Sequence, residues 1–207
     1  MIKDMTIQTF LDELASKAST PGGGGGAAVN GAIGAALISM VANFTIGKKG
    51  YEDVQDEFNR ILTQSEDLRA KLTDAIKDDV DVFNRVMAAY GMPKESEGEK
   101  KLRTEGIQSA LKEATDVPLT CAKLCRQVID LSQLAAEKGN TNVISDAGVA
   151  LLAGYAGLRS AALNVYINIG GIKDKEFADG RRQQLEALLD GLEVFKEDVY
   201  DLVKNKL

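Results

Sequence analysis

Asp79 is the residue whose place in the sequence most suggests acid–base chemistry. The apolar residues around it recur at helical spacings of three and four, the pattern of a helix core seam: Leu72, Ile76, Phe83, Val86 and Tyr90. A carboxylate on that side loses hydration, so its pKa should rise and it should suit proton transfer. A buried Asp satisfied by Ser, Asn or Lys from another helix fits the same pattern, and the sequence leaves both interpretations open.

Five consecutive glycines follow Pro21 and precede an apolar segment. Glycine lets a ligand approach the backbone, and free N–H groups at a helix start attract anionic or electron-rich groups. We therefore predict a ligand-binding loop; a flexible loop that lets two helices pack closely is the alternative. Nucleotide-binding loops do not fit, because no βαβ unit surrounds the run. The candidate ligand-binding residues of this run are Gly22, Gly23, Gly24, Gly25 and Gly26.

Two asparagines, Asn164 and Asn168, lie four residues apart inside an apolar run. Buried amides need hydrogen-bond partners. They would suit the donor and acceptor edge of a heterocycle, or they would tie two helices together. The sequence does not decide between these two roles.

Further polar candidates stand near the expected ends of helices. Asp146 follows a turn that contains Asn140, and a helix cap is its default explanation. Lys48 and Lys49 follow an apolar segment and would hold an anionic group or form a solvated pair.

Composition excludes several kinds of chemistry. The chain has 207 residues and no histidine, so a Ser-His-Asp triad, a His-based zinc site and an imidazole base are ruled out. The net charge of −6 argues against a nucleic-acid partner. Cys121 and Cys125, four apart, are interpreted as core residues rather than a disulfide framework.

The elements that must position these residues are all helical. No segment alternates as a strand would, so we predict an all-α fold, a single bundle-like domain over residues 1–207. It should have about six helices, two of them buried and rich in Ala and Gly. A kink or break is expected at Pro118. The expected helices are 6–16, 27–46, 51–90, one from 96 onward, 146–169 and 174–204.

Residues 18–47 carry no charge and are long enough to span a bilayer. The segment is rich in Ala and Gly and contains Ser, Thr and Asn, so we predict a buried core helix and no membrane association. The N-terminal residues lack the pattern of a secretory leader, and we expect a cytoplasmic protein.

Four stretches together resemble the cyclodeaminase/cyclohydrolase family of folate enzymes: PGGGGGAAVNGAIGAALISMVANFTIGKKGY, DDVDVFNRVMAAYGMPK, ATDVPLTCAKLC and GNTNVISDAGVALLAGYAGLRSAALNVYINI. The resemblance implies an all-helical homodimer that acts on a tetrahydrofolate derivative without a metal or another cofactor. Its two activities are methenyltetrahydrofolate hydrolysis and formiminotetrahydrofolate cyclodeamination. Cyclodeaminases usually read PGGGS, and Gly25 in place of that Ser favours the cyclohydrolase branch.

The resemblance also implies roles for the candidate residues. Asp79 would act as base and stabilise the cationic substrate, and Asp146 would make the second proton transfer. Asn164 and Asn168 would position the pterin against the glycine run. Lys48 or Lys49 would hold the glutamate carboxylates, and Asn140 belongs to the family's polar motif.

Overall fold

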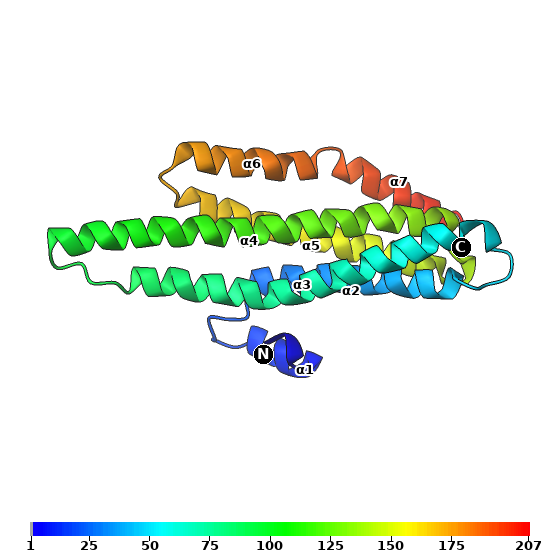
Figure 1. Ribbon diagram of the computed structural model, residues 1–207, viewed down its shortest axis with the longest axis horizontal. Coiled ribbons are helices and arrows are strands. Elements are labelled where there is room, and N and C mark those ends of the chain that lie inside the picture. Colours follow the sequence, from blue (N-terminus) through cyan, green and yellow to red (C-terminus); the bar gives the residue numbers. More distant parts are fainter. Residues whose placement is uncertain (1) are drawn as a thin grey trace.

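The computed structural model describes residues 2–207, and within them the fold is all-α, as predicted (Figure 1). Four long helices form an antiparallel bundle, α6 and α7 cover α4 and α5, and the short α1 lies beside the bundle. The α-helices are α1 (Ile7–Leu14), α2 (Gly23–Thr45), α3 (Gln55–Tyr90), α4 (Glu97–Lys138), α5 (Ile144–Gly170), α6 (Lys175–Leu189) and α7 (Leu192–Lys204). Short 3-10 turns occupy Ile2–Asp4, Glu52–Val54 and Thr141–Val143.

Small residues let α2, α4 and α5 approach closely. A Cβ on Gly157 of α5 would lie 2.8 Å from Cys125 Sγ and 3.0 Å from the carbonyl oxygen of Ala27. Both cysteines are buried here, as predicted. The faces of α2 and α5 that point away from this contact are exposed. In the most apolar 18-residue stretch of α2, half is buried inside the protein. Length and composition alone would also let α2 cross a membrane.

We expect Gly157→Ala to lower the free energy of unfolding by about 1–3 kcal/mol, because the added methyl overpacks the contact between α5 and its neighbours. Gly180→Ala on α6 is the matched control, since nothing lies within 4 Å of its Cβ position. That control should be neutral or stabilising by up to about 1 kcal/mol. Urea unfolding of both variants measures the difference, and equal stability would contradict the close approach.

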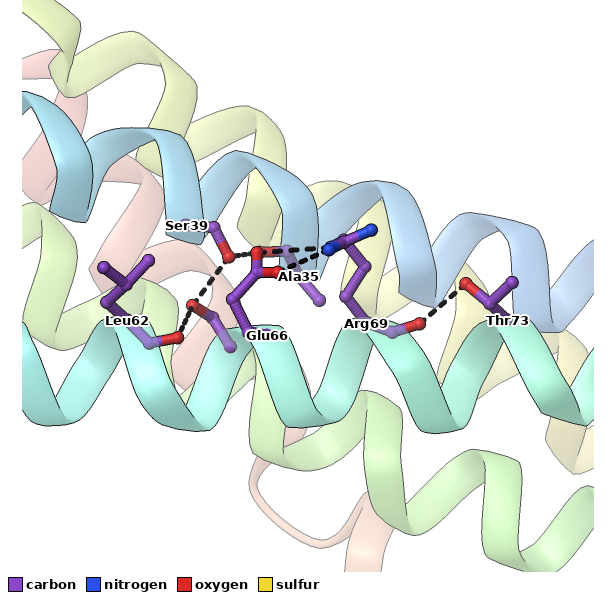
Figure 2. A network of polar contacts seen from close by, with 7 residues as sticks. Ala35, Ser39, Leu62, Glu66, Arg69 and Thr73 are labelled. Carbon is purple, nitrogen blue, oxygen red and sulfur yellow. Dashed lines mark hydrogen bonds and ion pairs between the residues drawn. The ribbon is translucent and has the colours of Figure 1, made fainter.

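A polar contact joins α2 to α3 in the middle of the bundle. The hydroxyls of Ser39 and Ser65 lie 2.8 Å apart, and both residues are buried. Figure 2 shows Glu66 between Ser39 and Arg69. Glu66 forms an ion pair with Arg69. Hydrogen bonds from Arg69 and then Ser39 lower the pKa of the Glu66 carboxyl. These contacts fix the register of α3 on α2 and thereby the position of Asp79 further along α3.

Two predicted elements differ from the structure. The last helix is divided, because Asp190 has an extended backbone and Gly191 adopts a left-handed φ of 66°, so α6 ends and α7 begins there. Of the kink or break predicted at Pro118, the break does not occur, because α4 runs without interruption from Glu97 to Lys138. The helix expected from residue 96 onward is α4, which starts with a capping box formed by Ser96 and Glu99.

Candidate active site

The glycine run is helical, which corrects the predicted loop. Gly23 to Gly26 form the first turn of α2, and Gly22 is its N-cap with an extended backbone and no side chain to cap the helix. The N–H groups of a first helical turn lack acceptors within their own helix. Asp79 of α3 supplies one, since the Gly25 N–H donates to Asp79 Oδ2 at 3.0 Å.

Asp79 lies in direct contact with the backbone of this first turn. A Cβ on Gly24 would lie 1.9 Å from Asp79 Oδ1, so only glycine leaves room for the carboxylate at that position. Burial raises the pKa of the Asp79 carboxyl above its ordinary value, and the hydrogen bond from the Gly25 N–H opposes that rise. The partial positive charge of the helix start also favours the ionised form. The result is a partly desolvated carboxylate held by backbone.

The raised pKa of Asp79 has a consequence for stability. The protonated Asp79 carboxyl contributes to the free energy of unfolding at a pH below its pKa in the unfolded state. This contribution is lost as the pH rises through the higher pKa of the folded state. Asp79→Asn removes this loss. We therefore expect the variant to gain stability relative to the wild type over the range in which the pH rises from the ordinary Asp pKa of 3.8 through the higher folded-state pKa. Urea unfolding across that range tests the sign, and a relative gain for the wild type instead would contradict it.

Only a small cavity lies on the inner side of Asp79. Its volume is about 10 Å³, and its lining includes Ala28, Pro118 and Cys121. That volume holds about one water molecule. A heterocyclic substrate therefore has to reach the carboxylate from outside, along the part of α3 that α2 does not cover.

The apolar seam of α3 becomes exposed beyond Asp79. Ile76 is buried, Phe83 and Val86 are half-buried, and Tyr90 is exposed. The reason is that α2 begins beside Asp79 and covers α3 only on one side of it. The predicted seam thus continues as a half-open apolar surface next to the carboxylate.

Asn164 stands at the same end of the bundle. Its Nδ2 donates to the carbonyl oxygen of Ser160 at 3.0 Å, and the side chain is half-buried. A Cβ on Gly23 would lie 3.9 Å from that Nδ2. Asn164, the first turn of α2 and Asp79 therefore form one group.

Asn168 has a structural partner that the sequence did not reveal. Pro118 has no N–H, so the carbonyl oxygen of Ala114 lacks the usual helical donor. The Nδ2 of Asn168 donates to that oxygen and links α5 to α4. This hydrogen bond explains how α4 continues through Pro118. It gives Asn168 the helix-tying role that the sequence left open, and it commits one side of the amide that the family resemblance assigns to the pterin.

The pairing of Pro118 with Asn168 makes the effects of two substitutions interdependent. Asn168→Ala should destabilise the protein by about 1–3 kcal/mol, because it leaves the Ala114 carbonyl without a donor. In a Pro118→Ala background residue 118 has its own N–H for that carbonyl, so the cost of Asn168→Ala should shrink. A double-mutant cycle by urea unfolding measures the coupling. Additive effects would show that the two positions act separately.

The remaining predicted residues lie at the other end of the bundle. Asn140 is 2% exposed, its Nδ2 donates to the Phe44 carbonyl at 2.7 Å, and its Oδ1 accepts from the Asn142 N–H at 3.0 Å. These bonds join the end of α2 to the turn before α5, a role that fits helix pairing rather than ligand binding. Asp146 lies in the first turn of α5 at this same end.

Lys48 and Lys49 follow α2 at this second end. Neither has a carboxylate within ion-pair distance in the described part of the chain. Hydrogen bonds with Thr141 are the main cause that lowers the pKa of the neighbouring Tyr51, and the charge of Lys48 adds to it. The 23 residues of α2 separate this end from Asp79, about 33 Å at the rise of an α-helix. The structure therefore divides the predicted residues into two groups.

The comparisons with known proteins agree with this fold and these motifs. Over 207 residues the chain is 57% identical to a methenyltetrahydrofolate cyclohydrolase of Methylorubrum extorquens, with 100% of both covered. It is 32% identical to the formimidoyltransferase-cyclodeaminase of Rattus norvegicus, over 90% of this chain but 34% of that protein. A crystal structure of a formiminotetrahydrofolate cyclodeaminase from Thermotoga maritima is similar with a TM-score of 0.85 and 37% identity, over 100% of this chain and 98% of that one. The family model described as Formiminotransferase-cyclodeaminase matches residues 6–187, and the chain belongs to this family.

Proposed function

We propose that this protein hydrolyses 5,10-methenyltetrahydrofolate to 10-formyltetrahydrofolate, a reversible reaction of one-carbon metabolism. The observation that carries the proposal is the Asp79 carboxylate, partly desolvated and held by the first turn of α2, where α2 begins to cover α3. Full-length identity of 57% to a methenyltetrahydrofolate cyclohydrolase supports the same reaction.

The reaction needs a base and negative charge at one place. Water adds to the methenyl carbon, which lies between N5 and N10 in a cationic amidinium, and Asp79 accepts the proton of that water. The carboxylate also stabilises the cation before the addition. The hydroxyl of the adduct then loses its proton and forms the C=O bond as the bond between N5 and the carbon breaks. N5 keeps the electron pair and takes up a proton, and the formyl group stays on N10.

The surroundings of Asp79 suit the ring system of a folate. The half-open apolar surface of Phe83 and Val86 offers packing for a flat ring. Asn164 presents an amide beside Gly23, where it would meet the polar edge of the pterin. The backbone of the glycine turn would lie against the same ring, because no side chains stand in the way.

Formiminotetrahydrofolate cyclodeamination is the second candidate. It forms the methenyl bridge and expels ammonia, and the same carboxylate would serve it. The Thermotoga maritima protein of similar structure is named a formiminotetrahydrofolate cyclodeaminase. Identity of 57% to the cyclohydrolase, against 32% to the rat protein and 37% to the Thermotoga maritima cyclodeaminase, favours hydrolysis. The third candidate is a non-catalytic helical module. It would bind folate or form a dimer without turning over a substrate.

Two assays on the purified protein separate these candidates. The first follows the loss of methenyltetrahydrofolate absorbance, corrected for spontaneous hydrolysis, and the second follows ammonia release from formiminotetrahydrofolate. Accelerated hydrolysis without ammonia release supports the cyclohydrolase. Ammonia release would identify a cyclodeaminase, and no turnover in either assay would contradict both enzymatic functions.

The protein is further proposed to be a homodimer whose subunits meet through the open faces of α2 and α5. The helix α2 contains no charged residue, and α5 contains only Asp146 and Arg159. Exposed apolar patches of this kind mark interaction sites. Ile33, Leu163 and Ile167 are exposed by 47%, 70% and 76%. Analytical ultracentrifugation tests the dimer, and Leu163→Glu should shift it to monomer.

The other expectations stay proposals of the same kind. The net charge of −6 supports the absence of a nucleic-acid partner. The packing of α2 against three neighbouring helices supports a core helix and a protein that acts off the membrane. The cytoplasmic location is proposed from the sequence. No metal or other cofactor is needed for the proton transfers described, and full activity after chelation would support this.

A further inference from the structure

Two cavities lie on opposite sides of the contact between α3 and α4, close to Asp79. The inner one, of about 10 Å³, is bounded by Asp79 and by residues of all four long helices. The outer one, of about 500 Å³, is bounded only by residues of α3 and α4. Ala75 of α3 and Val117 of α4 line both cavities, so these two side chains form the wall between them.

The wall formed by Ala75 and Val117 is thin. Ala75 contributes a single methyl group and is 8% exposed, and Val117 is half-buried. Ala75 precedes Asp79 by four residues on α3, so the two side chains lie on the same face of that helix, one turn apart. Little protein therefore separates the Asp79 carboxyl from the outer cavity.

Polar groups border the wall on both sides. The inner cavity has the Asp79 carboxyl and the Cys121 thiol in its lining, and it holds about one water molecule. Charged side chains at a surface keep their hydration, so water reaches the outer side of the wall. Several groups share this role, and no single one of them is needed. The polar residues that line the outer cavity are Lys71, Asp74, Asp78, Asp116 and Thr120.

The proposed hydrolysis takes up one water and releases one proton in each turnover. The reacting ring system is a cation in the substrate and neutral in the product, so the charge leaves as a proton. The proton that the adduct hydroxyl loses is matched by the one that N5 gains. The proton that Asp79 takes from the attacking water is therefore the one that has to return to solvent before the next cycle.

The bound ring obstructs one way out for this proton. A heterocyclic substrate reaches Asp79 along the part of α3 that α2 does not cover, and it stays there until the product leaves. A proton that left on that side would have to wait for product release. The thin wall on the other side of Asp79 offers a route that is independent of the ring.

We infer that water and protons exchange with Asp79 through the wall between Ala75 and Val117, on the side away from the folate ring. Water from the outer cavity passes between the two side chains to the inner cavity. The O–H bond of the Asp79 carboxyl breaks, an O–H bond forms on this water, and the proton moves on to solvent. The inference rests on the proposed function. It makes Ala75 and Val117 positioning residues, which act through the water that they admit.

A single-turnover stopped-flow experiment with a pH-indicator dye tests this route. Excess protein is mixed with methenyltetrahydrofolate in weak buffer, so that absorbance follows the chemical step and the dye follows the released proton. A chase of labelled 10-formyltetrahydrofolate with unlabelled compound gives the rate of product release. In the wild type the dye and the absorbance should change with the same rate constant. A proton signal that waits for product release would overturn the inference, and this comparison needs no variant.

Ala75→Val and Val117→Ile test the wall itself, since each adds bulk between the two cavities. Proton release should slow by about tenfold or more and lag behind the loss of absorbance, which corresponds to about 1.4 kcal/mol of added barrier. KM should stay near the wild-type value, because the wall lies away from the ring. Circular dichroism selects the folded variants for this comparison.

Ala89→Val is the matched control for Ala75→Val. Ala89 is also 8% exposed and lies on α3, but it lines neither cavity. Its proton and absorbance signals should coincide as in the wild type. Coincident signals in folded Ala75→Val and Val117→Ile would overturn the inference and leave the hydrolysis intact. A wild-type protein that does not consume methenyltetrahydrofolate would instead contradict the proposed function.

Discussion

Asp79→Asn is expected to lower the turnover of methenyltetrahydrofolate by about 10²–10⁴-fold, the range for loss of a general base. Asparagine has nearly the same shape and still offers an oxygen to the Gly25 N–H, so the hydrogen bond to α2 can persist. It cannot accept the proton of the attacking water or stabilise the cationic ring by charge. Stopped-flow or steady-state absorbance with the purified variant measures the loss.

The controls for this variant separate chemistry from folding. Helicity by circular dichroism should match the wild type, because the carboxylate is removed without a change in side-chain volume. Asp78→Asn, at the exposed neighbouring position on α3, should keep its activity. If Asp79→Asn retained wild-type turnover with a native fold, Asp79 would be a structural cap of α2, and the proposed mechanism would lose its base.

The sequence predicts Asp79 because a carboxylate in an apolar heptad seam violates a strong rule. The seam, the all-α class and most helix boundaries follow from periodicity in the same way. The glycine run misleads for a physical reason: five glycines disfavour a helix when they are considered alone. In the folded protein the Gly25 N–H has an acceptor in Asp79, and packing with α3 and α5 outweighs local propensity.

Other features depend on pairings that no local pattern contains. The role of Asn168 requires the knowledge that it faces the Ala114 carbonyl, one turn before Pro118. A proline inside a helical pattern, together with an Asn in a distant apolar run, is a signal that the Asn amide replaces the missing N–H. The pattern alone does not show that the two residues are in contact. Likewise, the sequence places Lys48 only 31 residues before Asp79. The helix between them puts the two at opposite ends of the bundle.

Gly24→Ala is the second substitution with a large expected effect. The new methyl would lie 1.9 Å from Asp79 Oδ1, which no real contact allows, so the carboxylate has to swing away from the start of α2. It would then lose the Gly25 N–H and its place where α2 begins to cover α3. Because a small displacement of a catalytic group costs about 10²-fold, we expect turnover to fall by at least that factor. Overpacking should also destabilise the fold by about 1–3 kcal/mol.

Gly26→Ala, two residues along in the same turn, is the matched control for Gly24→Ala. Nothing lies within 4 Å of its Cβ position, and alanine is the better helix former, so this variant should be as stable as the wild type or up to about 1 kcal/mol more stable. Its turnover should fall less than that of Gly24→Ala, because its methyl does not displace Asp79 and can affect only the packing of the proposed ring against the turn. Equal loss of activity in both variants would mean that contact with the substrate, and not the position of Asp79, is what requires glycine in this turn. Full activity in Gly24→Ala would mean that Asp79 does not need its place against α2.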